Sequence, residues 1–356
     1  MNPQNKKFLI IKLSALGDVT HTLPVLSALR KNHPHAFIAW MVEDRYQDLL
    51  TGNPDIDLLI PVRTKYWRKN ISFKTLSEIV GVIADLRKHR FDTVFDFHGL
   101  IKSGLIAFLS GSPDRVGFPA RECKEPLSAW FSTRNGPAAK PGAHVVDRYL
   151  SLIGVEAPEN TAEFPIPLPE EAERSVARFF DTHPDLTAKP VIGINPGAGF
   201  ESKLWNLDRF TALADRITSE LSCAVLLTWG PGEEAKVQHI QKQMRQQCWI
   251  APPTSIIESA ALYRRMALLI SCDSGPLHLG AALGVPTVSV FGPTDPARNG
   301  PYGNKHAVIC KTLPCSFCWK RKCPLQTGEC MESVTTDEVF DAVKKSFTDH
   351  VKVIAS

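Results

Sequence analysis

A small-residue turn after a run of apolar residues carries the strongest chemical signal in the sequence. Met266 to Ile270 predicts a buried strand, Asp273-Ser274-Gly275-Pro276 follows it, and Leu277 to Leu283 has a helix-like pattern. The first N–H groups of a helix lack intrahelical partners and its dipole is positive there, so such a terminus attracts anions. The stretch therefore predicts that the protein holds a phosphorylated ligand.

A second glycine-containing turn follows another apolar run. Val191 to Asn195 predicts a strand, Pro196-Gly197-Ala198-Gly199 comes directly after it, and Lys203 follows closely. Glycines let a ligand approach the backbone, and a lysine offers a point charge to phosphate. The P-loop pattern GxxxxGK[ST] is absent from the chain. A solvated surface lysine is the competing interpretation of Lys203.

Two carboxylates and a histidine lie where predicted strands give way to helices. Asp18 follows the strand Phe8 to Leu13, and Glu233 follows the strand Ala224 to Thr228. Asp18 could face a cleft between domains and Glu233 could accept ribose hydroxyls, but either could simply cap the next helix. His278 flanks the predicted anion site, although a lone helical histidine is more often packed. No GxGxxG follows the first strand, which argues against a dinucleotide site there.

The elements that must position these residues alternate along the chain. Predicted strands comprise residues 8–13, 37–42, 58–62, 93–97, 191–195, 224–228, 266–270 and 287–291. Predicted helices between them comprise residues 23–29, 79–86, 207–221, 256–262 and 277–283. Strands separated by helices predict a parallel, doubly wound α/β sheet in each half.

A stretch rich in proline and acidic residues, 157–173, interrupts this alternation and is interpreted as a linker. We therefore predict two Rossmann-like domains, residues 1–165 and 170–335, that face a central cleft. Ligands are expected at the C-terminal ends of their strands. The last helix, within residues 336–356, is expected to be able to pack back onto the first domain.

The composition limits the class of protein. The chain has 356 residues, 44% of them hydrophobic and 22% charged, which suits two globular domains. The net charge of +4 gives no nucleic-acid signature. The start, MNPQNKKFLIIKL, does not have the pattern of a signal peptide, and no run approaches the roughly 18 apolar residues that span a bilayer. We expect a cytoplasmic protein that binds no nucleic acid.

Five of the nine cysteines cluster near the C-terminus. The spacing Cys315-x2-Cys318 suits a structural zinc, with Cys323 and Cys330 as further ligands. The outer spacings are irregular, so a loop of reduced thiols is the alternative.

Four motifs, in this order along the chain, resemble the ADP-heptose:lipopolysaccharide heptosyltransferases of glycosyltransferase family 9. They are KLSALGDVTHTLPVLSALR, FDFHGLIKSG, NPGAGFESKLWNLDRF and DSGPLHLGAALGVPTVSVFGPTDP. The first half is most similar to the heptosyltransferase I type, through WRK at 67–69, RECKEPL at 121–127 and HVVDR at 144–148. The resemblance implies a GT-B fold and inverting transfer of L-glycero-D-manno-heptose from ADP-heptose to the inner Kdo of Kdo2-lipid A. It further implies peripheral association with the cytoplasmic face of the inner membrane and no required cofactor.

The resemblance also implies a role for each candidate residue. Asp18 matches the catalytic base, and Lys203 matches the lysine that stabilises the leaving diphosphate. The donor-binding residues that it implies are Ala198, Gly199, Glu233, Thr254, Asp273, Ser274, Gly275 and His278. The acceptor-binding residues that it implies are Lys65, Arg68, Lys69 and Lys124. The first domain would then bind the acceptor and the second the ADP-sugar. A single base with an in-line leaving group is what an inverting transfer needs.

Other functions remain open at this point. The cysteine cluster is not typical of the best-known heptosyltransferase I enzymes, so a heptosyltransferase II-type transfer to a heptose acceptor is an alternative. A sugar-nucleotide epimerase or hydrolase would need further acidic residues at the turns. A non-catalytic phosphoglycan-binding protein would need no base at all.

Overall fold

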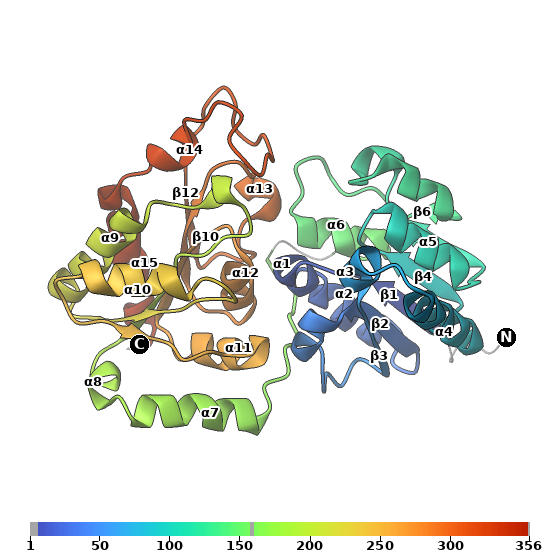
Figure 1. Ribbon diagram of the computed structural model, residues 1–356, viewed down its shortest axis with the longest axis horizontal. Helices are drawn as coiled ribbons and strands as arrows, with labels where there is room; N and C mark the ends of the chain where they lie inside the picture. The colour runs from blue at the N-terminus through green and yellow to red at the C-terminus, as the bar shows by residue number, and fades with distance from the viewer. Residues whose placement is uncertain (1–5, 157–159, 355–356) are drawn as a thin grey trace. The chain divides into compact units, whose positions relative to one another are not determined.

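The computed structural model describes residues 6–156 and 160–354, and for residues 350–354 only the backbone (Figure 1). The chain divides into two compact units, Met1–Pro167 and Leu168–Ser356, close to the predicted domain boundary. Residues 1–5 of the N-terminal stretch and residues 157–159 of the predicted linker lie outside the described residues.

The first unit is built on a parallel six-stranded sheet in the order β3-β2-β1-β4-β5-β6. Its strands are β1 (Lys7–Ile11), β2 (Phe37–Glu43), β3 (Leu58–Val62), β4 (Thr93–Asp96), β5 (Asp114–Gly117) and β6 (Arg134–Asn135). Its α-helices are α1 (Leu16–Thr20), α2 (Leu23–Asn32), α3 (Thr64–Lys69), α4 (Phe73–His89), α5 (Ile101–Leu109) and α6 (Val145–Leu152). Short 3₁₀ helices are η1 (Asp44–Leu49), η2 (Ala120–Glu122) and η3 (Pro126–Phe131).

The second unit repeats this plan, with a six-stranded parallel sheet in the order β12-β11-β10-β7-β8-β9. Its strands are β7 (Val191–Asn195), β8 (Ala224–Leu227), β9 (Trp249–Ile250), β10 (Leu268–Cys272), β11 (Thr287–Phe291) and β12 (His306–Cys310). Its longer helices are α7 (Glu170–Asp181), α9 (Leu207–Glu220), α10 (Glu234–Gln243), α11 (Ile256–Arg264), α12 (Gly275–Ala282) and α15 (Thr336–Ile354). Its short helices are α8 (Pro184–Thr187), η4 (Glu201–Lys203), α13 (Pro296–Asn299) and α14 (Glu329–Glu332).

Both sheets have the strand order of a Rossmann fold. In each unit the first strand lies at the centre, with the second and third strands on one side and the fourth to sixth on the other. The chain therefore reverses direction across the sheet between β1 and β4, and again between β7 and β10. Ligands of such sheets bind at the C-terminal ends of the strands at this switch point.

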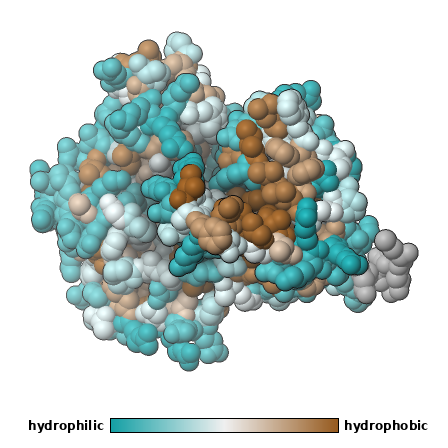
Figure 2. Space-filling model, turned by 45° about the vertical axis from the view of Figure 1, so that its right-hand side comes forward, coloured by the Kyte–Doolittle hydropathy of each residue, from teal (hydrophilic) through white to brown (hydrophobic). Residues whose placement is uncertain are grey.

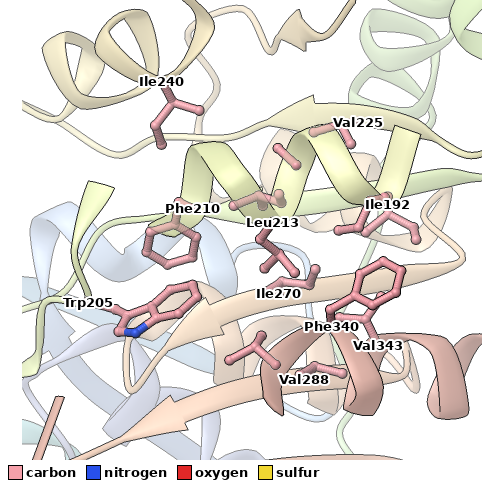
Figure 3. Close-up of a cluster of buried hydrophobic side chains, with 14 of the residues drawn as sticks. Ile192, Trp205, Phe210, Leu213, Val225, Ile240, Ile270, Val288, Phe340 and Val343 are labelled. Atoms are coloured by element: carbon pink, nitrogen blue, oxygen red, sulfur yellow. The ribbon is translucent and has the colours of Figure 1, made fainter. Parts of the chain in front are cut away.

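The core of the second unit explains why the strand sequences are continuously apolar. One face of the sheet packs against α9, α10 and α15, with Ile192, Ile270 and Val288 among the buried side chains (Figure 3). Leu269 points to the other face, where it would touch a Cβ placed at Gly280 of α12. Strands covered on both faces need no polar alternation.

The last helix differs from expectation. We expected that it could pack back onto the first domain, but α15 contributes Val339, Phe340 and Val343 to the core of the second unit (Figure 3). It packs against α9, β11 and β12. The spacing of the three apolar residues puts them on one helix face, and that face completes the cover of the second sheet.

Phe340→Ala should therefore destabilise the second unit. Phe340 is 2% exposed, and the Arg216 guanidinium lies 3.9 Å from its ring centroid. Removing a buried phenylalanine costs about 3–5 kcal/mol. Urea unfolding measures the loss, and Lys345→Ala on the exposed side of the same helix should change stability by less than about 0.5 kcal/mol. Equal stability of the two variants would show that α15 does not pack here.

Candidate functional site

Four neighbouring strands of the second unit end at one edge of the sheet, and the loops after them carry most of the predicted donor residues. In sheet order β11-β10-β7-β8, these loops contain Thr294, Asp273, Gly197 and Glu233. Because the strands are parallel, their carboxyl ends place these residues along the same edge. The switch point between β7 and β10 lies in the middle of this row.

Asp273 is the centre of this edge. One carboxylate oxygen lies 2.6 Å from the Lys203 ammonium and accepts a hydrogen bond of 2.6 Å from the Thr294 hydroxyl. The other oxygen lies 3.2 Å from His278 Nε2. Asp273 is only 5% exposed. The structure thus brings Lys203, predicted to stabilise the leaving diphosphate, together with the predicted donor-binding residues Asp273 and His278.

The partners of Asp273 keep its carboxyl group ionised. Burial raises the pKa of this carboxyl, but the hydrogen bond and charge of His278 and the charge of Lys203 outweigh burial and lower the pKa to about 2. The Lys203 ammonium also lies 4.6 Å from the centroid of the Phe200 ring. The lysine is therefore fixed at the strand edge by an ion pair and a cation–π contact.

The N-terminus of α12 begins beside Asp273. Ser274 is the N-cap residue, and its hydroxyl accepts the Leu277 N–H at 3.4 Å and contacts the Ser271 hydroxyl at 2.8 Å. Gly275 and Pro276 form the first turn. The Lys203 ammonium and the positive terminus of α12 thus both lie next to Asp273, an arrangement suited to a diphosphate.

The loops after β7 and β8 fit closely together. A Cβ at Gly197 would collide with the Glu233 carboxylate. That carboxylate accepts the Gly230 N–H at 3.2 Å and lies 3.2 Å from the Lys236 ammonium. Glu233 is therefore held against the backbone of the Gly197 turn, and the cap position that it occupies before α10 lacks a side-chain cap bond.

The remaining predicted donor residues lie at the same edge. Ala198 packs partly against the core, while a Cβ at Gly199 would meet open space. Thr254 follows β9 at the end of the row, and its hydroxyl lies 2.7 Å from that of Ser259. The open backbone at Gly199 leaves room for a ligand beside Lys203.

In the first unit, Asp18 lies just after β1, beside the switch point with β4. Its carboxylate is 3.9 Å from the Lys12 ammonium and 3.6 Å from the Lys124 ammonium. Lys12 is 1% exposed, and its ammonium also donates to the Phe97 carbonyl at 2.8 Å and the Tyr149 hydroxyl at 2.6 Å. The Asp18 side chain keeps 23% exposure, so it is accessible to a substrate.

Asp18 is strongly acidic in this setting. Burial raises the pKa of its carboxyl, but Lys12 and Lys124 outweigh that effect and hold the pKa far below its usual range. The neighbouring His98 is neutral, since burial and the charge of Lys12 lower its pKa to about 2. Asp18 is therefore an ionised carboxylate among cations, and it also helps to cap α1, because its side chain accepts the Ala15 N–H at 3.3 Å.

The predicted acceptor residues lie on two segments of the first unit. Lys65, Arg68 and Lys69 are exposed on α3, directly after β3, and Lys124 lies at Asp18. Positive charges crowd around α3: burial and the charge of Arg45 lower the pKa of Lys65. Burial together with Arg68 and Lys65 lowers the pKa of Lys102. Such a surface favours an acceptor with carboxylate or phosphate groups.

The cysteine cluster does form one region. Cys315, Cys318, Cys323 and Cys330 line a cavity of about 30 Å³, and all nine cysteines of the chain are free. In the part of the chain that the structure describes, however, no group of three or more His, Cys, Asp or Glu side chains is arranged to hold a metal ion. The structural zinc and the loop of reduced thiols both stay predictions.

Sequence reasoning missed several residues of these sites. Lys12 is not among the candidates from the sequence, although a lysine between buried strand residues is itself a signal of a paired internal charge. Thr294 lies in the second turn of the opening stretch, but only the fold brings its hydroxyl to Asp273. Arg45 and Lys102 also lie near the cations of α3. The pairing of β2 with β3 brings Arg45 there, and a contact between α5 and α3 brings Lys102. No local sequence pattern indicates either contact.

Comparison with known proteins places this geometry in a family. The lipopolysaccharide heptosyltransferase 1 of Pseudomonas aeruginosa is 29% identical over 329 residues, 91% of this chain and 89% of that protein. A solved structure of a glycosyl transferase family 9 protein from Veillonella parvula superposes with a TM-score of 0.83 at 26% identity, over 97% of this chain and 98% of that one. The E. coli heptosyltransferase WaaC with ADP gives a TM-score of 0.75 at 24% identity, over 96% and 99%.

The prediction of a GT-B fold with two Rossmann-like units is confirmed by these structures and by the two sheets. The family model for glycosyltransferase family 9 (heptosyltransferase) matches residues 79–328, more than half of the chain. The match covers Asp273 with its partners Lys203, His278 and Thr294, the Gly197 turn, and α5 of the first unit. The chain therefore belongs to glycosyltransferase family 9, the heptosyltransferases.

Proposed function

We propose that this glycosyltransferase moves L-glycero-D-manno-heptose from ADP-heptose to the Kdo region of Kdo2-lipid A, with inversion at the anomeric carbon. The observation that carries the proposal is the setting of Asp18, an ionised and accessible carboxylate next to a cluster of cations in the first unit. A base in a basic surface suits an acceptor that presents both a hydroxyl and acidic groups, as Kdo and lipid A phosphates do.

The second unit supplies the donor half of the proposal. Lys203 and the α12 N-terminus flank Asp273, and together they would neutralise the charge that develops on the departing ADP. The relative WaaC has been solved with ADP, which supports a nucleotide at this edge. Glu233, which lies against the Gly197 turn, is the residue proposed to contact the donor nucleotide.

The proposed chemistry is a single displacement. Asp18 takes the proton of the acceptor hydroxyl while that oxygen forms a bond to the anomeric carbon, and the bond to the ADP β-phosphate breaks. Asp273 keeps Lys203 oriented through the reaction. The proposal needs no cofactor, because the lysine and backbone N–H groups carry the charge stabilisation.

A heptose acceptor, as in a heptosyltransferase II-type reaction, is the second candidate. The cysteine cluster favours it, because by the sequence resemblance this cluster is not typical of the best-known heptosyltransferase I enzymes. A non-catalytic phosphoglycan-binding protein would use Asp18 only as the partner of Lys12 and Lys124 and would show no turnover.

The acceptor is a membrane lipid, so the proposed place of action is the cytoplasmic face of the inner membrane. In the described residues, no helix has the length and apolar character to cross a bilayer. Association would then be peripheral, through surface contacts.

Purified protein should release ADP and form a heptosylated product when it is mixed with ADP-heptose and Kdo2-lipid A. Asp18→Asn should lower kcat by about 10²- to 10⁴-fold, as expected for loss of a general base, and leave ADP affinity unchanged. Asp48→Asn, an exposed change in the same unit, is the control and should behave as wild type. Turnover only with a heptosylated acceptor would favour the second candidate, and full activity of Asp18→Asn would remove Asp18 from the mechanism.

Lys124→Met should move the acid limb of the kcat profile to higher pH. Lys124 is one of the two leading charges that lower the pKa of Asp18, so its loss raises that pKa. The base works only when ionised, so activity is lost as pH falls through its pKa, and a higher pKa moves this loss upward. The surface change Lys88→Met is the control, and superimposable acid limbs in all three proteins would contradict the assignment.

ADP should protect the protein against heat more than UDP or GDP does, because binding to the folded state raises its stability.

Gly197→Ala should weaken ADP binding by roughly tenfold or more. The new methyl group displaces the Glu233 carboxylate, so a hydrogen bond between the ligand and this charged group is lost. Gly81→Ala adds a methyl group in open space and is the matched control. Equal ADP protection in both variants would exclude Glu233 from the donor site.

A further inference from the structure

The first unit exposes large apolar side chains on three neighbouring elements, α4, α5 and η3. We call this surface the apolar face and define it by six residues, Phe73, Leu76, Leu105, Phe108, Leu127 and Trp130. Phe73 is 89% exposed and Trp130 is 81% exposed. Helix α5 packs against both α4 and η3. Figure 2 shows a broad hydrophobic area on this side of the first unit.

Helix α5 has the reverse of the usual amphipathic order. Its large residues Ile101, Leu105 and Phe108 recur at helical spacing and are all exposed, between 40% and 51%. The side that packs inward buries the small residues Ser103, Gly104 and Ala107, and Ile106 packs partly against the core. A helix that only needed to cover a sheet would bury its large side chains. The outward side of α5 is therefore built for contact with an apolar surface.

Gly104 joins η3 to this helix. A Cβ at Gly104 would meet the Phe131 ring and the Ser128 carbonyl at 2.9 Å, so η3 lies directly on α5. This close contact holds Leu127 and Trp130 next to the exposed side of α5. Exposed apolar side chains of this size gathered on adjacent elements mark an interaction site.

The surroundings of the apolar face are basic. Between Arg63 and Leu76 the chain has five lysine or arginine residues and no acidic residue. Lys102 on α5 adds a further cation, whereas Arg121 and Lys124 before η3 alternate with Glu122 and Glu125, so the net positive charge comes from α3, the start of α4 and Lys102. An isologous contact with a second copy would place this basic rim against itself, which is unfavourable. An anionic lipid surface complements both the apolar face and its rim.

We propose that the apolar face docks onto a bilayer that contains anionic phospholipids. Phe73, Phe108 and Trp130 enter the acyl-chain boundary, and the cations of the rim contact the headgroups. Tryptophan and phenylalanine beside lysine and arginine are the usual pattern of helices that lie in a membrane interface.

The position of the face fits a membrane-anchored acceptor, and in this respect the inference rests on the proposed function. Lys124 lies 3.6 Å from Asp18, and η3 begins two residues after Lys124. Glu125, between them, accepts the first N–H of α5, from Ile101, at 2.7 Å. A protein docked through η3 and α5 would therefore hold Asp18 close to the lipid surface, where the sugar of a lipid acceptor emerges.

Co-sedimentation with vesicles tests the proposal. The full chain should bind vesicles of phosphatidylcholine mixed with phosphatidylglycerol, and bind phosphatidylcholine alone more weakly. The double variant Phe73→Ser/Trp130→Ser should lose about tenfold or more of this binding, because two large apolar groups no longer enter the bilayer. Lys74→Glu should weaken binding only to the anionic vesicles. Leu325→Ser removes a 60% exposed leucine of the second unit and should bind as wild type.

Two further measurements separate this proposal from the others. ADP protection against heat should be the same in the double variant and the wild type, which shows that the variant is folded and has an intact donor site. Vesicle binding by the double variant equal to that of wild type would overturn the proposal. So would a concentration-dependent dimer that the double variant abolishes, with no vesicle binding by wild type. If vesicle binding depends on the face but no ADP-heptose turnover occurs, the docking surface stands and the proposed function fails.

Discussion

The ion pair between Asp273 and Lys203 is the interaction on which the candidate site depends. Both side chains are nearly buried, at 7% and 13% exposure, and a buried charge without a partner is costly. The pair therefore ties the loop after β7 to the loop after β10 across the switch point of the sheet. Thr294 and His278 also contact the Asp273 carboxylate. Four segments of the second unit therefore meet at this one carboxylate.

The first unit also contains a lysine–aspartate ion pair, but there the lysine is the fully buried partner. There the buried group is a cation, Lys12, and its partners are a carbonyl, a hydroxyl and the carboxylate of Asp18. Because Lys12 is fixed inside the unit, Asp18 stays ionised while part of its surface remains open. In each unit an internal lysine–aspartate pair thus stands at the end of the central strands. In the second unit the lysine is the group proposed to act on substrate, and in the first it is the aspartate.

Much of this architecture follows from local patterns, and the failures have physical causes. The strands Val191–Asn195 and Thr287–Phe291 were predicted at their observed bounds, because continuous apolar runs between turns mark strands buried on both faces. Strands β6 and β9 have two residues each and lie at sheet edges, too short for any periodicity to register. Helix α5 escaped prediction because its large residues face outward, which removes the usual polar and apolar alternation. The candidate residues were found where turns followed strands, whereas Lys12 and Thr294 depend on contacts between segments distant in sequence.

The central claim is that one carboxylate, Asp18, promotes a single displacement at the anomeric carbon of the donor. Nuclear magnetic resonance of the product formed from ADP-heptose and Kdo2-lipid A reports the anomeric configuration of the transferred heptose directly. The account predicts a configuration opposite to that of the donor. Retention of the donor configuration would contradict it, because retention requires two displacements or a different reaction face, and Asp18 could then not act as the base of a single step.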